Sequence, residues 1–146
     1  MKAVLQRVQQ ASVVVEGEVI GQIGTGILML VCAEHGDTPD IGQRLLDKVA
    51  KLRIFGDEQG KMNRSLLDVD GELLIVSQFT LAADTAKGNR PSYTAAAEPQ
   101  LAKQLYDHLI EYAQSQGIKT ASGRFGADMK VSLTNDGPVT IPISMI

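Results

Sequence analysis

The sequence has little of several residue types, and each shortage excludes a class of protein. Its single cysteine, Cys32, rules out an internal disulfide. There is no tryptophan, and aromatic residues make up only 4% of the chain, which argues against a platform of stacked aromatics for single-stranded nucleic acid. Basic residues are not in excess either, with 14 Lys and Arg against 17 Asp and Glu. This excludes a protein that coats nucleic acid by bulk charge, but it leaves local phosphate contacts open.

Long apolar runs and metal-ligand clusters are missing as well. No stretch approaches the roughly 18 apolar residues of a membrane span, and the first residues lack the apolar block of a signal peptide. No Cys, His, Asp or Glu cluster has metal-ligand spacing, and neither His35 nor His108 has a motif partner, so both are expected to be structural or solvated. We therefore expect a cytoplasmic protein with no metal or other cofactor.

Short apolar and alternating stretches, separated by turn residues, predict a chain rich in strands. Residues 16–17 are expected to form the tight turn of a hairpin. Residues 61–70 show no clear pattern and stay unassigned. The predicted strands cover residues 2–9, 12–15, 18–23, 27–32, 53–56, 73–81, 119–122, 129–133 and 139–143.

Two helices complete the predicted fold. Thr38 is the expected N-cap of the first helix and Pro39 its first residue, whereas Pro99 opens the second helix and Gly117 ends it. Apolar residues at helical spacing predict the core-facing sides, which are Ile41, Leu45, Val49 and Leu52 in the first helix and Leu101, Leu105, Leu109 and Tyr112 in the second. The fold class is α+β: one domain over residues 1–146, with a curved antiparallel or mixed sheet or barrel and two main helices.

The stretch 73–81 combines a buried strand with polar side chains. Its first four residues are apolar, and Ser77, Gln78 and Thr80 then interrupt the run. Strand alternation would place Ser77 and Phe79 on one face of the sheet. Gln78 and Thr80 would then lie on the other face. Buried polar groups without partners cost about 1–3 kcal/mol each. The stretch is therefore either a strand end whose polar groups bond neighbouring backbone, or the floor of a pocket with free backbone N–H groups.

Three other features have a structural explanation beside a functional one. Cys32 lies in an apolar run, which predicts a buried core residue rather than a nucleophile. The polar loop 83–92, with Lys87 and Arg90, is either a mobile rim over a site or a solvated connector. The segment 134–140 has Asn-Asp-Gly-Pro between two strands and predicts a turn, although Gly before Pro also allows a backbone that presents two carbonyl groups in one direction.

Two of these segments, taken together, resemble the signature motifs of the D-aminoacyl-tRNA deacylases. They are Ser77-Gln-Phe-Thr-Leu81 and Asn135-Asp-Gly-Pro-Val-Thr140, in the order that the family has. The start of the chain at residues 1–8, the loop at 87–92 and the segment at 124–131 are also similar to that family. The resemblance covers the chain from end to end.

The resemblance implies an enzyme that hydrolyses the ester joining a D-amino acid, or mischarged glycine, to the 3′ acceptor end of tRNA. It also implies a homodimer with the active sites at the subunit interface, no cofactor and no membrane contact. The implied roles are catalysis for Ser77, Gln78, Phe79 and Thr80, exclusion of L-amino acids for Gly137 and Pro138 joined by a cis peptide bond across the interface, support of that element for Arg7 and Asn135, and adenosine binding for Phe125 and Met129.

Simple chemistry is compatible with that implied activity. An aminoacyl ester is already activated, so the enzyme needs to position it and stabilise its oxyanion, which the backbone N–H groups of Phe79 and Thr80 could do. The ribose 2′-hydroxyl would orient the water, and the rival is direct attack by the Thr80 hydroxyl, which has no visible base. The candidate phosphate contacts, each of which could equally be a solvated surface charge, are Lys87, Arg90, Arg124 and Lys130.

Two other classes of function stay open. One is a non-catalytic dimeric binding module, in which both motifs only form an interface. The other is a general hydrolase of small esters that acts through Thr80 or Ser77. Incubation with D-aminoacyl-tRNA distinguishes the first from the enzyme, and a nitrophenyl ester screen detects the second.

Overall fold

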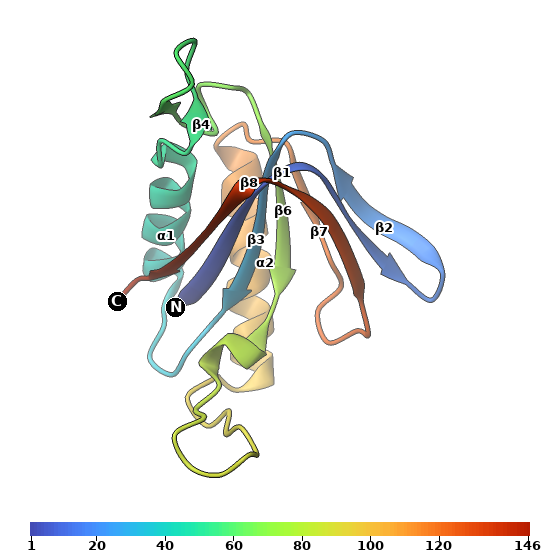
Figure 1. The fold of residues 1–146 in the computed structure, drawn as a ribbon. Helices are drawn as coiled ribbons and strands as arrows, with labels where there is room; N and C mark the ends of the chain where they lie inside the picture. The colour runs from blue at the N-terminus through green and yellow to red at the C-terminus, as the bar shows by residue number, and fades with distance from the viewer.

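The computed structural model describes residues 1–146 and contains eight strands, two α-helices and one short 3-10 helix (Figure 1). The strands are β1 (Lys2–Val15), β2 (Glu18–Ile23), β3 (Gly26–Cys32), β4 (Phe55–Gly56), β5 (Met62–Arg64), β6 (Glu72–Ser77), β7 (Thr120–Ser122) and β8 (Lys130–Ser144). The helices are α1 (Pro39–Lys51), η1 (Phe79–Ala82) and α2 (Pro99–Ser115). The predicted fold class is confirmed, since the two helices pack against a mixed sheet that is nearly closed into a barrel.

β1 is the strand to which most of the sheet is attached. It pairs antiparallel with β8 along one side, and on its other side with β3 in its first half and with β2 in its second. β6 continues the sheet parallel to β3, and β7 lies parallel to β6. Because β1 takes part in three pairings, its register fixes the relative heights of the strands around it.

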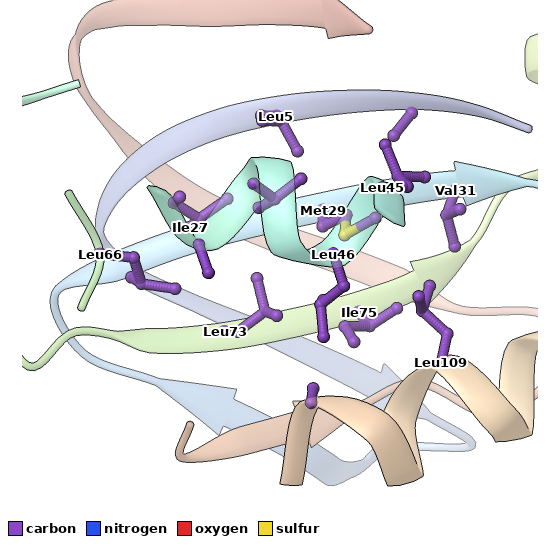
Figure 2. Packing of buried hydrophobic residues seen from close by; sticks show 14 of the residues in the cluster. Leu5, Ile27, Met29, Val31, Leu45, Leu46, Leu66, Leu73, Ile75 and Leu109 are labelled. Atoms are coloured by element: carbon purple, nitrogen blue, oxygen red, sulfur yellow. The ribbon is translucent and has the colours of Figure 1, made fainter. Parts of the chain in front are cut away.

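The main core lies between the sheet and the two helices. Figure 2 shows Leu45 and Leu46 of α1 and Leu109 of α2 facing side chains of the sheet, among them Met29 and Ile75. A second, smaller cluster lies on the opposite side of the sheet, with Val8 and Val13 from β1 against Leu28, Leu74 and Val76. The sheet is therefore buried on both faces near its centre, and this fixes the strand ends that carry the site.

The helix signals in the sequence predict the observed boundaries. Thr38 caps α1 and its hydroxyl accepts the N–H of Ile41 at 3.4 Å, with Pro39 as the first helical residue. Pro99 opens α2, and Gly117 follows its end with a φ of 78°, a conformation that glycine adopts at little cost. Neither helix is long and apolar enough to cross a membrane.

Two predicted strand boundaries are wrong because pairing overrides the local pattern. Residues 2–9 and 12–15 belong to the single strand β1, since both halves pair with β8 although exposed glutamines interrupt the alternation. Residues 129–133 and 139–143 are likewise predicted as separate strands, but β8 runs as one strand from Lys130 to Ser144. The Asn-Asp-Gly-Pro segment is consequently a bulge inside a strand and not a turn between two.

The predicted strand over 73–81 is also wrong in its second half. β6 ends at Ser77, and the chain then winds into η1, so strand alternation does not describe Phe79 and Thr80. Of the predicted strand at 53–56, only Phe55–Gly56 pairs, and its partner β5 lies in the segment that the sequence left unassigned.

Candidate active site

A cavity of about 520 Å³ opens at the end of the sheet where β3 and β6 terminate, beside α2 and the loop between β7 and β8. Figure 1 shows this end, with η1 and the loop after it, opposite the end that carries β4. Most residues that line the cavity are apolar. The predicted site residues among them are Ser77, Gln78, Phe79, Phe125 and Met129. A mostly apolar cavity with a few polar groups is typical of a site for a small organic ligand.

Directly after the end of β6, two backbone N–H groups have no hydrogen-bond acceptor. The N–H of Gln78 donates to the carbonyl oxygen of Val31 at 2.8 Å and ends the pairing with β3. η1 begins at the next residue, and the first N–H groups of a helix have no partner within it. The amides of Phe79 and Thr80 accordingly have no acceptor in the chain. Two adjacent free donors are able to bind an oxyanion.

The side chains around η1 supply no base. The Gln78 amide donates to the Thr80 hydroxyl, and no carboxylate or imidazole bonds that hydroxyl. The thiol of Cys32 is buried and donates to the carbonyl oxygen of Phe79 at 3.5 Å, and burial raises the pKa of the thiol. Cys32 is therefore a buried core residue, as the sequence predicts, and its protonated thiol also bonds the start of η1.

Phe125 and Met129 form part of the cavity wall and are held by their neighbours. The Phe125 ring packs on Tyr106, with the ring centroids 6.0 Å apart. The buried Tyr106 hydroxyl donates to the carbonyl oxygen of Ile75 at 2.8 Å, and burial raises the pKa of Tyr106 to about 12. Gly123 makes room for Met129, because a Cβ at Gly123 would lie 2.6 Å from the thioether sulfur.

The second signature segment forms a bulge in β8, away from the cavity. Between the two pairings that flank the bulge, β1 has only Arg7 whereas β8 has residues 136–139. The peptide bond between Gly137 and Pro138 is cis, and both residues are exposed.

Two side chains hold this bulge in place. The Nε of Arg7 donates to the carbonyl oxygen of Asp136 at 2.8 Å, and its Nη1 donates to that of Ile54 at 2.6 Å. From within β8, the Oδ1 of Asn135 accepts the N–H of Val139 at 2.9 Å. The bulge is thus connected to β1, to the segment before β4 and to its own strand.

The bulge and η1 lie at opposite ends of the sheet. Val8, next to the bulge, is opposite Gly26 on β3, whereas Ser77 is opposite Val31. Gly26 and Val31 are five residues apart, which corresponds to about 17 Å along a strand at about 3.3 Å per residue. Within one chain, the two signature segments therefore do not meet.

The remaining polar candidates lie outside the cavity lining. His35 shares a hydrogen bond with the Thr94 carbonyl at 2.9 Å, and His108 shares one with Gln43 at 3.1 Å, in agreement with structural roles. No group of three His, Cys, Asp or Glu side chains lies close enough together to hold a metal ion. Tyr106 also lines the cavity and was missed by the sequence reasoning, although its position next to Leu105 on the buried side of α2 could have revealed it.

The sheet, the two helices and the cavity define a small α+β fold built on a mixed sheet that is nearly closed into a barrel. The chain belongs to the D-Tyr-tRNA(Tyr) deacylase family, whose model matches residues 4–144. The family resemblance found in the sequence is thereby confirmed.

The chain is similar to individual known proteins along nearly its whole length. A D-aminoacyl-tRNA deacylase of Cereibacter sphaeroides is 60% identical, over 97% of this chain and 97% of its own. One of Delftia acidovorans is 57% identical, over 99% and 96%. Among solved structures, the c-Myc DNA Unwinding Element Binding Protein superposes with a TM-score of 0.90 at 42% identity, covering 99% of this chain and 98% of its own. A probable eukaryotic D-amino acid tRNA deacylase shares the fold, with a TM-score of 0.82 at 16% identity and 97% of both chains covered.

Proposed function

We propose that the protein hydrolyses the ester bond between a D-amino acid and the 3′ end of tRNA, and that it also removes glycine from mischarged tRNA. The observation that carries this proposal is the pair of free amide donors at Phe79 and Thr80, next to a cavity of about 520 Å³. Relatives at 57–60% identity bear the name D-aminoacyl-tRNA deacylase. Residues 1–146 would act as one domain, in the cytoplasm, where aminoacyl-tRNA is used.

In this proposal the terminal adenosine occupies the cavity against Phe125 and Met129. The ester carbonyl then lies over the start of η1, and its oxygen accepts the N–H groups of Phe79 and Thr80 as negative charge develops on it. One donor of this kind contributes roughly 2.7–4 kcal/mol to the stability of the transition state. The enzyme thus acts by positioning and by hydrogen bonding, and needs no metal or other cofactor.

The water that attacks the ester is oriented by the neighbouring ribose 2′-hydroxyl. The alternative nucleophile is the hydroxyl of Thr80, which would need a base to take its proton. The hydrogen-bond partner of that hydroxyl is the side-chain amide of Gln78, which is a donor and not a base. This arrangement favours the substrate-assisted route.

Selection of the D enantiomer comes from the bulge in β8 of a second copy of the chain. Because the bulge lies about 17 Å along the sheet from η1 of its own chain, a homodimer is required to bring Gly137 and Pro138 over the partner's cavity. A pocket that senses a methylene discriminates by only about 1–3 kcal/mol. Backbone held in place by Arg7 and Asn135 instead excludes any L side chain, and it admits glycine, which has none.

Few phosphate contacts are expected in this complex. Lys130 forms an ion pair with Asp128 at 3.0 Å, whereas Lys87, Arg90 and Arg124 are exposed and form no ion pair. Binding of aminoacyl-tRNA should therefore weaken as the salt concentration rises. The logarithm of the binding constant should fall with the logarithm of the salt concentration along a shallow slope, which corresponds to contacts with about three phosphates. A slope near zero would show that none of these residues touches the nucleic acid.

The decisive experiment is a side-by-side time course of amino-acid release from D-tyrosyl-tRNA and L-tyrosyl-tRNA. Rapid release from the D ester alone is expected, with D-aspartyl-tRNA cleaved at a rate comparable to D-tyrosyl-tRNA because the filter does not read the side chain. Similar rates for D-tyrosyl and L-tyrosyl esters would contradict the proposal. No release from any ester would favour a dimeric binding module, and cleavage of nitrophenyl esters without stereochemical preference would favour a general esterase.

A further inference from the structure

An exposed pair of aromatic rings lies at the mouth of the cavity. Phe79 is 55% exposed and Tyr93, from the loop between η1 and α2, is 37% exposed. The two rings meet edge to face, with centroids 5.2 Å apart and planes inclined by 72°. Phe79 lines the cavity, so the pair continues the cavity wall outwards into solvent. Neither ring is needed by the core, and both leave aromatic surface uncovered.

The loop holds Tyr93 in place from both sides. A turn closes directly after it, where the N–H of Ala96 donates to the Tyr93 carbonyl oxygen at 3.0 Å. His35 fixes the same turn, since its backbone N–H donates to Ala95 at 3.2 Å and its ring bonds the Thr94 carbonyl at 2.9 Å. Before Tyr93, a bridge pairs Asp84 with Ser92. The ring is therefore presented by ordered backbone, which lowers the entropic cost of binding against it.

Two cations lie on the same loop. Lys87 and Arg90 are exposed and form no ion pair. The carboxylate of Asp84, on the same loop, instead accepts a hydrogen bond from the N–H of Ala86 at 2.9 Å. Figure 1 shows this loop next to η1 at the cavity end of the sheet. Aromatic faces beside unpaired cations are the combination that binds single-stranded nucleic acid, in which bases stack on rings and phosphates lie near the charges.

We infer that Tyr93 and Phe79 bind the base of the penultimate nucleotide of the acceptor end, while Lys87 and Arg90 contact the backbone phosphate beside it. The inference rests on the proposed function, because it places the terminal adenosine in the cavity and the preceding nucleotide at the cavity mouth. The single-stranded end of the tRNA would then be held at two bases, and this would fix the terminal ribose that carries the ester. Tyr93 would then contribute to binding only when the substrate carries a second nucleotide. It is separate from the groups that contact the ester.

The test uses three D-tyrosyl esters of increasing length with the intact protein. The first is the ester of adenosine, the second that of adenosine 5′-phosphate, and the third that of the dinucleotide cytidylyl-adenosine. For the wild-type protein, kcat/KM is expected to rise about tenfold when the cytidine is added, because stacking of one base on an aromatic side chain has roughly this effect. Tyr93→Ala should abolish that rise and Tyr93→Phe should keep it.

The cations give a separate readout in the same series. The double variant Lys87→Gln, Arg90→Gln should reduce the gain that comes with the phosphate and leave the gain from the base. As a control for truncation of an exposed apolar side chain, Leu67→Ala, at a residue 49% exposed in the turn before β6, should keep the wild-type length dependence. Thermal melting of each variant checks that it is folded.

The outcomes distinguish this inference from the proposed function. If the wild-type protein cleaves neither the three esters nor D-tyrosyl-tRNA, the proposed function fails. If it cleaves all three but does not prefer the dinucleotide, or if Tyr93→Ala lowers kcat/KM by the same factor on every ester, the inference is overturned. An equal loss of kcat/KM on every ester would mean that Tyr93 acts only by packing against Phe79.

Discussion

At the η1 end of the sheet, the amides of Phe79 and Thr80 have no acceptor, whereas at the bulge in β8 side chains bond the backbone on each side of Gly137 and Pro138. The first region adjoins a cavity, and the second is exposed and lies outside the cavity lining. One region therefore offers unused hydrogen-bonding capacity to a ligand, and the other offers a fixed shape. Under the proposed function, one region stabilises the reacting ester and the other excludes the wrong enantiomer.

The largest effect is expected from a change in the shape of the bulge. In Gly137→Ala, the new Cβ would lie against the backbone nitrogen of Val139 and 2.8 Å from its Cγ2, so the bulge must move. A displacement of about 1 Å in a positioning element costs about 100-fold in rate. The measurement is kcat/KM on D-tyrosyl-tRNA. Gly56→Ala is the matched control, since a Cβ there meets nothing within 4 Å, and unchanged turnover in Gly137→Ala would contradict the role of the bulge.

A mixing experiment tests whether the two regions of different copies form one site. Gly137→Ala damages the bulge, and Phe125→Ala removes the ring at the cavity wall, so each homodimer should be nearly inactive. In the mixture, half of the dimers are mixed and one of their two sites is intact, which restores about a quarter of wild-type activity. Activity that stays at the level of the separate variants, while native mass spectrometry shows that mixed dimers form, would place both regions in the same subunit.

A smaller effect is expected at the cavity from Thr80→Ala. If the 2′-hydroxyl of the substrate orients the water, the variant keeps at least about a tenth of the wild-type kcat, whereas loss of a true nucleophile costs on the order of a millionfold. Single-turnover cleavage of D-tyrosyl-tRNA measures the difference. Near-complete loss of turnover in a correctly folded dimer would refute the substrate-assisted route.

The smallest effect concerns the support of the cavity wall. Tyr106→Phe removes the hydrogen bond to Ile75 and should lower the free energy of unfolding by about 1 kcal/mol. Folding raises the pKa of Tyr106 from 10.0 to about 12, so its contribution is complete below pH 10 and is lost as the pH rises towards 12. Urea unfolding of both proteins at neutral and alkaline pH checks this. An identical alkaline loss in both would show that Tyr106 is not the titrating group.

Local sequence patterns predicted the fold class because the elements carry their own signals. The cap at Thr38, the proline at position 39 and the helical spacing of Leu45 and Val49 act within a few residues of one another. The bulge was predicted as a turn because Asn-Asp-Gly-Pro has turn chemistry, and only the pairing of both flanks with β1 keeps the strand continuous. The strand end at Ser77 was missed for a similar reason, since the β3 partner ends there.

The lining of the cavity was predictable only where a motif marked it. Ser77, Gln78 and Phe79 do line the cavity together with Phe125 and Met129, although these two groups are far apart in the sequence. Tyr106 and Tyr93 carry no motif of their own. Their importance comes from what lies opposite them, the Phe125 ring in one case and the Phe79 ring in the other, and such contacts exist only after the chain has folded.

Because β1 passes as one strand from the cavity end of the sheet to the bulge, the number of its residues sets the spacing between the two regions. One residue inserted near Leu5 would shift the bulge by about 3.3 Å and turn every later side chain of β1 to the opposite face. Natural length variation among relatives of this chain should therefore accumulate in the hairpin at Glu16–Gly17, where added residues leave that spacing intact.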